Sequence, residues 1–295
     1  MAGTSASAPR LMVSFPTAGV AGGDYAGEVE TTVPSSHRLA RLPMLHDGTR
    51  PMITHVCPVP QIVAATAEQM AEVDRIMTEE LGVDLLQMME LAGSALAILA
   101  RDRFLGGDPR GKRVLVLAGS GGNGGGGMAA ARRLHGWCAE VEVWVTRETA
   151  FLRGAAANQV RSLRALGVPV HVPPESSLPA ADLIVDALIG YSLAGPPSGH
   201  TAALIRAAND HPEPVLSLDL PSGLDATIGT VFDPCIQADV TLALALPKRG
   251  AWAPWGHGMT GELYLADIGI PQEVYARLGL DVGPIFARQH LLRIG

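Results

Sequence analysis

Short apolar runs alternate with stretches of helical periodicity through most of this chain. The runs at 183–185 and 215–218 are typical of parallel strands that helices cover on both faces. Thr66-Ala-Glu-Gln69 has the spacing of a capping box and predicts a helix that ends near Gly82. The later elements predicted are helices over 84–103, 127–135, 152–166 and 199–209, and strands over 113–118, 140–146, 168–172, 182–187, 214–219, 239–246 and 261–267. The alternation predicts an open α/β sandwich.

The first 58 residues lack this pattern. Ala, Gly, Ser, Thr and Pro are interleaved there without a period, and such a segment buries too little apolar surface to order itself. We therefore expect a disordered or weakly ordered tail over residues 1–58 and a single domain over 59–295. Arg10 and Arg38 leave organellar targeting open, although Asp24 counts against it.

The composition narrows the class of protein. Of the 295 residues, 47% are apolar and 4% aromatic, so the core must be aliphatic. A net charge of −7 without a Lys and Arg cluster argues against a nucleic-acid partner. The most apolar helical stretch contains Asp84 and Glu90, which argues against a membrane span. The three scattered cysteines indicate reduced thiols and a cytoplasmic location.

A glycine-rich stretch follows the apolar run that begins at Val114. Residues 119–127 read Gly-Ser-Gly-Gly-Asn-Gly-Gly-Gly-Gly, and good helix formers start at Met128. Because glycine lets a phosphate approach backbone N–H groups closely, a strand, glycine loop and helix in this order predict an anion-binding cradle. The match to G-x-G-x-x-G is weak alone, since an ordinary tight turn would give the same pattern.

Two further loops follow apolar runs and begin with an aspartate. Asp186 opens the segment 186–195, and Asp219 opens the segment 219–225. Ligands of open α/β sheets bind at the carboxyl ends of the strands, where these loops must lie. One aspartate there most often caps a helix. Two of them beside a glycine loop favour a ligand site.

Six blocks of sequence, taken in order, resemble the NAD(P)H-hydrate epimerase family, the YjeF N-terminal type domain. They are Met89-Glu-Leu-Ala-Gly93, the glycine loop, Val185-Asp-Ala-Leu-Ile-Gly190, Leu218-Asp-Leu-Pro-Ser-Gly-Leu-Asp225, Leu246-Pro-Lys-Arg-Gly250 and Gly261-Glu-Leu-Tyr-Leu-Ala-Asp-Ile-Gly269. The resemblance implies a three-layer αβα Rossmann-like sandwich with a mostly parallel sheet, commonly a homodimer. It also implies an isomerase that interconverts the R and S epimers of hydrated NADH or NADPH, a dinucleotide substrate.

The resemblance assigns site residues as well. A potassium ion (K⁺) would be held by Asn123, Asp186 and Ser222, whose oxygen atoms suit a hard alkali cation. Epimerisation by loss and return of hydroxide needs a proton donor and acceptor, and Asp219 is the first choice for that role. The dinucleotide contacts would fall on Gly122, Asn123, Gly124, Gly125, Gly126, Gly190, Tyr191, Ser192, Leu193, Ala194, Gly195, Pro196 and Asp219.

The chain departs from the family's pattern at three positions. Gly122 and Gly126 replace an asparagine and an aspartate, and Leu91 replaces an asparagine. If the lost aspartate capped a helix, its loss costs about 1 kcal/mol. If it was a catalytic acid or base, the loss is about 10²–10⁴-fold in rate. The alternative to an active epimerase is therefore an impaired or repurposed member that binds a nucleotide-like ligand or a protein partner.

Two other features leave alternatives open. Lys248 and Arg249 could contact a phosphate or form a solvated turn. A dinucleotide-dependent dehydrogenase would place an acidic residue or arginine about 20 residues after the glycine loop, where Arg147 and Glu148 lie. That hypothesis leaves the Asp-Leu-Pro-Ser-Gly block unexplained, so it ranks last.

Overall fold

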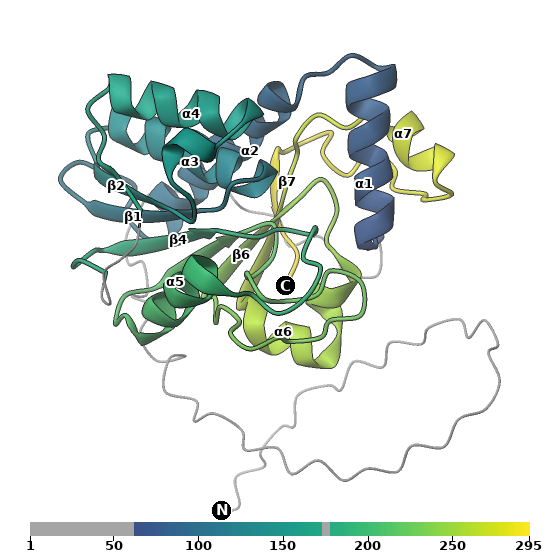
Figure 1. Ribbon diagram of the computed structural model, residues 1–295. Helices are drawn as coiled ribbons and strands as arrows, with labels where there is room; N and C mark the ends of the chain where they lie inside the picture. Colours follow the sequence, from purple (N-terminus) through teal and green to yellow (C-terminus); the bar gives the residue numbers. More distant parts are fainter. Residues whose placement is uncertain (1–61, 173–177) are drawn as a thin grey trace, which may run out of the picture. The chain divides into compact units, whose positions relative to one another are not determined.

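The computed structural model describes residues 62–172 and 178–295, which belong to one compact unit (Figure 1). The tail predicted over 1–58 lies outside the described residues. Within them, no helix has both the length and the apolar character that crossing a membrane requires.

One sheet of eight strands runs through the middle of the domain, in the order β3-β2-β1-β4-β5-β6-β7-β8. All neighbouring strands are parallel except β7 and β8. The strands are β1 (Arg113–Ala118), β2 (Glu140–Val145), β3 (Val170–His171), β4 (Leu183–Ala187), β5 (Val215–Leu218), β6 (Val240–Leu244), β7 (Glu262–Ala266) and β8 (Leu291–Arg293). The chain winds outward from β1 to β3 and then returns to β4 beside β1, which makes the β1–β4 edge the switch point of the winding.

Helices cover both faces of this sheet (Figure 1). α2, α3 and α4 pack on one face through residues such as Leu96 and Met128, and α5 packs on the other through Leu204 and Ile205. The helices are α1 (Ala67–Arg75), α2 (Leu85–Arg103), α3 (Gly122–Gly136), α4 (Gly154–Ala165), α5 (Gly199–Asp210), α6 (Pro254–Thr260) and α7 (Gln272–Arg277), with a π-helical turn at Ile76–Glu80 after α1. The predicted three-layer αβα sandwich with a mostly parallel sheet is confirmed.

α1 begins with the capping box that the sequence predicts. The hydroxyl of Thr66 accepts a hydrogen bond from the backbone N–H of Gln69 at 3.2 Å, and the Gln69 side chain accepts one from the Thr66 N–H at 2.9 Å. Just before it, Ala65 pairs with the loop after β6: its N–H donates to the Pro247 carbonyl at 2.9 Å. This pairing ties α1 to the loop that follows β6.

The glycine stretch is helical rather than a loop, and this corrects the prediction of a helix over 127–135. α3 begins at Gly122, so most of the glycines form its first turns. A Cβ atom on Gly124 would lie 1.9 Å from the Gly119 carbonyl oxygen, and one on Gly127 would lie 2.4 Å from the Ala187 Cβ. Because these distances exclude a side chain, close packing of α3 on its neighbours requires glycine at both positions, whether or not a ligand binds.

Candidate active site

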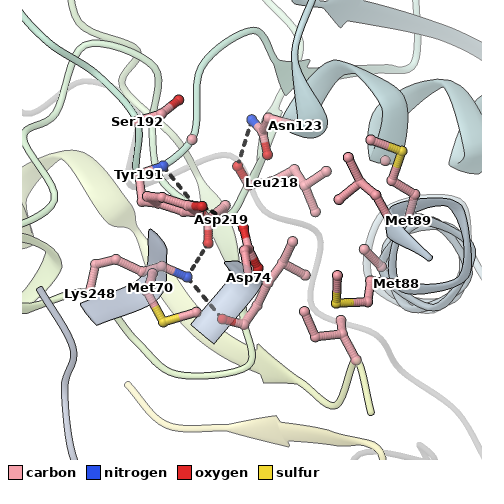
Figure 2. Close-up of a pocket in the computed structure, with 17 residues that line it drawn as sticks. Met70, Asp74, Met88, Met89, Asn123, Tyr191, Ser192, Leu218, Asp219 and Lys248 are labelled. Carbon is pink, nitrogen blue, oxygen red and sulfur yellow. Dashed lines mark hydrogen bonds and ion pairs between the residues drawn. The ribbon is translucent and has the colours of Figure 1, made fainter. Parts of the chain in front are cut away.

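A cavity of about 300 Å³ lies at the carboxyl ends of the central strands, where α1 and α2 cover them. Met88 and Met89 of α2 line one side of it, and Met70 of α1 lies beside Lys248 (Figure 2). The cavity also carries polar groups from the first turn of α3 and from the loops that follow the strands. These polar residues are Asn123, Tyr191, Ser192, Asp219 and Lys248, and Asp74 of α1 joins them. An apolar cavity with a few convergent polar groups is the usual form of a small-molecule site.

Asp219 lies immediately after β5, and its residue is 4% exposed. The backbone N–H of Tyr191 donates to Oδ2 at 2.9 Å, and the ammonium of Lys248 donates to Oδ1 (Figure 2). Asp219 has a φ of 70°, which aspartate tolerates better than most residues. Its carboxylate is thus held in one orientation at the cavity surface.

Lys248 supplies the cation next to this carboxylate. Its residue is 1% exposed, and its ammonium also donates to the Leu244 carbonyl at 2.9 Å. Arg249, by contrast, is exposed, so the solvated turn considered for this pair describes only Arg249. Neither isolated charge would be stable in this buried place, and each one requires the other.

Asp74 brings a second carboxyl group to the cavity from α1. The hydroxyl of Tyr191 donates to its Oδ2 at 2.5 Å. Burial raises the pKa of the Asp74 carboxyl above its usual range, and the nearby charge of Asp219 acts in the same direction. Burial likewise raises the pKa of the Tyr191 hydroxyl. Tyr191 therefore contacts both carboxyl groups, one through its backbone and the other through its side chain.

Sequence reasoning did not single out Asp74, and it left Lys248 undecided. A signal for Asp74 exists, because it lies four residues after the buried Met70 and so shares the covered face of α1. A carboxyl group on an apolar helix face needs a partner or a function. No comparable local signal separates buried Lys248 from exposed Arg249.

The three residues assigned to potassium all border the segment that follows β4. Asp186 is fully buried and accepts a hydrogen bond from the Ser222 hydroxyl at 2.6 Å. The same hydroxyl accepts one from the Ile189 N–H at 2.9 Å. Asn123 lies beside Gly190, the residue after Ile189. A Cβ atom placed on Gly190 would be 3.3 Å from Asn123 Oδ1.

Two observations on these groups fit an oxygen-bound cation. Asn123 Oδ1 is buried and has no hydrogen-bond partner among the described residues. Among the described residues, the hydrogen-bond partners of Asp186 are neutral: the hydroxyls of Ser217 and Ser222 and two backbone N–H groups. Burial therefore raises the pKa of Asp186, and a bound cation would favour its ionised form.

The remaining predicted contact residues divide into three groups. Gly122, Asn123, Gly126, Gly190, Tyr191, Ser192 and Asp219 line the cavity, whereas Gly124 and Gly125 are buried in α3 and Leu193, Ala194, Gly195 and Pro196 lie outside the lining. Of the departures from the family's pattern, Gly122 and Gly126 line the cavity but Leu91 does not; its residue is 47% exposed. Contact of these residues with a dinucleotide stays a prediction.

The fold and the cavity define a class: Rossmann-like domains that bind a small molecule at the carboxyl edge of the sheet. Comparison with known proteins narrows this class. The sequence model of the family described as "YjeF-related protein N-terminus" matches residues 85–250. The chain belongs to this family.

Two similar proteins and one solved structure support the same assignment. An NAD(P)H-hydrate epimerase of Dehalogenimonas lykanthroporepellens is 42% identical over 221 residues, which cover 74% of this chain and 87% of that protein. An NAD(P)H-hydrate epimerase of Truepera radiovictrix is 39% identical over 73% of this chain and 94% of its own length. The crystal structure of the yeast protein ynu0 matches with a TM-score of 0.64 and 27% identity, covering 79% of this chain and 100% of that one.

Proposed function

We propose that this chain is an NAD(P)H-hydrate epimerase, which interconverts the R and S epimers of hydrated NADH and NADPH. The observation that supports this most is a buried, ion-paired carboxylate at Asp219 on the surface of a cavity at the carboxyl edge of the sheet. The names of the relatives above agree with the proposal.

Epimerisation of the hydrated carbon needs only a few catalytic side chains. The reacting carbon of the substrate carries a hydroxyl and is bonded to a ring nitrogen, so loss of the hydroxyl gives a planar cation that the nitrogen stabilises. Return of water to the other face inverts the carbon. Asp219 is placed to accept a proton in this exchange, because two donors fix its carboxylate at the cavity surface.

The size of the cavity suits part of the substrate. About 300 Å³ is at the lower end for small-molecule sites, so we assign it to the hydrated nicotinamide ring and its sugar. The ring would lie against Met88 and Met89. The rest of the dinucleotide would extend along the loop 193–196, next to the cavity-lining Ser192.

Potassium is part of the proposal. Asn123, Asp186 and Ser222 would hold the ion through amide, carboxylate and hydroxyl oxygens. The unpartnered Oδ1 of Asn123 and the neutral surroundings of Asp186 support this assignment. When bound, the ion would supply the positive charge that the buried carboxylate lacks. A homodimer and a cytoplasmic location are further expectations.

A second candidate function rests on a specific observation. Gly122 and Gly126 line the cavity, so the amide and the carboxylate expected there are absent from the surface that would contact the substrate. This favours a family member that binds a nucleotide-like ligand but turns over slowly or not at all.

One experiment separates these proposals. Purified R epimer of hydrated NADH is incubated with the protein in KCl, and formation of the S epimer is followed by chromatography against the spontaneous rate. We expect catalysis above that rate, and a loss of about 10²–10⁴-fold in Asp219→Asn. The exposed Asp281 gives a matched control, since Asp281→Asn should keep full activity. A wild-type rate equal to the spontaneous one overturns the epimerase proposal, and substrate binding by calorimetry would then support the second candidate.

A further inference from the structure

We propose that Asp74 is a second catalytic carboxyl group, which protonates the departing hydroxyl of the substrate while Asp219 accepts the proton of the incoming water. This inference rests on the proposed function. It assigns a role to a side chain that the chemistry above leaves unused.

The geometry places both carboxyl groups on one cavity but on different elements. Asp74 comes from α1 and Asp219 from the end of β5, and both line the same space (Figure 2). Tyr191 lies between them: its hydroxyl donates to Asp74 at 2.5 Å and its backbone N–H to Asp219 at 2.9 Å. A substrate in this cavity therefore lies next to two carboxyl groups that a single residue holds in place.

The surroundings differentiate the two groups. The ammonium of Lys248 donates to Asp219, whereas the hydrogen bond that Asp74 receives comes from a neutral hydroxyl. The titratable groups that face Asp74 are Tyr191, Lys248 and Asp219. Burial raises the pKa of Asp74 and outweighs the lowering by Tyr191 and Lys248, and the charge of Asp219 acts in the same direction as burial. Two carboxyl groups in different surroundings are the usual basis for separate acid and base roles.

The step balances in atoms and electrons. The proton of Asp74 moves to the substrate hydroxyl, the C–O bond breaks with its electron pair on oxygen, and the ring nitrogen's lone pair forms a C=N bond. A water then bonds to the carbon from the other face, the C=N pair returns to nitrogen, and the surplus proton goes to Asp219. One water leaves and one enters. Solvent exchange, or the reverse reaction with the roles swapped, restores both groups.

Tyr191 is a positioning residue in this scheme. Its hydroxyl bond lowers the pKa of Asp74 against the larger effect of burial. Removal of the hydroxyl should therefore make Asp74 a weaker acid. This gives a signed test that a merely structural role would not predict.

The kinetic test compares variants in the epimerase assay over a range of pH. Because Asp74 must be protonated to act, kcat should fall as pH rises through its pKa. Asp74→Asn should lower kcat by about 10²–10⁴-fold with little change in KM and should abolish this alkaline fall. Tyr191→Phe should move the fall to higher pH, and the Asp281→Asn control should leave it in place.

A second readout does not depend on activity. Side-chain carboxyl carbons of ¹³C-labelled aspartate are titrated by NMR, and the signal that is missing in Asp74→Asn identifies Asp74. We expect it to titrate above the ordinary value of 3.8, and higher still in Tyr191→Phe. Should Asp74→Asn fail to fold, Tyr191→Phe and the wild-type titration carry the test.

The outcomes distinguish the two proposals. An active wild type whose Asp74→Asn variant keeps its kcat and its pH profile overturns the role of Asp74 and leaves the epimerase proposal intact. An inactive wild type overturns both. An Asp74 signal that titrates at or below 3.8 overturns the acid role whatever the activity.

Discussion

Lys248 donates a hydrogen bond to Asp219 across 29 positions of sequence, with side chains that are 1% and 5% exposed. The pair joins the loop after β6 to the end of β5 on the surface of the cavity. Because Ala65 also pairs with the loop after β6, the same loop supports α1 and its carboxyl group at Asp74. The loop after β6 thus connects Asp219 at the end of β5 to α1.

Removal of the cation should destabilise the fold. Lys248→Met leaves Asp219 buried without a charged partner, and we expect the free energy of unfolding in urea to fall by about 3–5 kcal/mol. Arg249→Met replaces the exposed neighbour of Lys248 and serves as the control. Its free energy of unfolding should stay within about 0.5 kcal/mol of the wild-type value. The double variant Lys248→Met with Asp219→Asn should lose less than the sum of the single variants, because neither charge remains; asparagine also tolerates the φ of 70° at this position. A loss in the double variant equal to the sum of the two single losses would contradict a stabilising ion pair between Lys248 and Asp219.

The glycines of α3 should differ sharply in their tolerance of alanine. At Gly127 a Cβ atom would meet the Ala187 Cβ at 2.4 Å, and β4 has little room to move. At Gly125 it would meet the Met89 sulfur at 2.6 Å, at the flexible end of a side chain. We expect Gly127→Ala to cost about 1–3 kcal/mol. Gly125→Ala should cost less, since Met89 can rotate away and alanine favours a helix by about 1 kcal/mol. Equal melting temperatures for the two variants would refute this ranking.

Acid should weaken the contact between α2 and β7. Burial alone would raise the pKa of Glu262, but its ion pair with Arg103, 2.7 Å between Nη2 and Oε1, lowers it below the ordinary value of 4.5. Because the pKa of Glu262 is lower in the folded state than in the unfolded state, its ionised form stabilises the fold. This contribution is complete above about pH 4.5 and is lost as the pH falls and Glu262 is protonated. Glu262→Gln should therefore show a shallower loss of unfolding free energy between about pH 5 and pH 3. Glu140→Gln, at the exposed first residue of β2, should follow the wild type.

Potassium should stabilise the fold if the proposed ligands bind it. We expect a higher melting temperature in KCl than in LiCl at equal ionic strength, since a ligand that binds only the folded state stabilises it by mass action. Asn123→Ala removes the unpartnered oxygen and should abolish the difference, while Ser192→Ala, an exposed residue of the cavity lining, should retain it. Identical melting curves in the two salts for the wild type would remove potassium from the proposal.

The sandwich was predictable because strands such as β1 and β4 are largely aliphatic runs and Thr66 begins a complete capping box. The start of α3 was not predictable, because glycine disfavours helix formation. The glycines there are required by tertiary packing, such as that of Gly127 against Ala187, which the local sequence does not reveal. β8, α6 and α7 were also missed. β8 has three residues, α7 has six, and α6 contains Pro254 and two glycines, so none of them gives a periodic signal.

The candidate site was predictable where a loop follows a strand, as at Asp219. Asp74 and Lys248 depend on contacts between distant segments, which spacing along the chain does not reveal. The long separation between Asp74 and Tyr191, 117 positions, illustrates the point. A helix residue such as Asp74 becomes a site residue only when α1 is placed over the sheet.

The methionines that line the cavity have a consequence for how this site could diverge. Gly122 and Gly126 present no side chain to the cavity, so the shape of the space depends on the residues around them. Met70, Met88 and Met89 line it with long, adaptable side chains. New substrate preferences within this lineage would therefore arise by exchange of those three thioethers, with the chemistry at Asp219 kept unchanged.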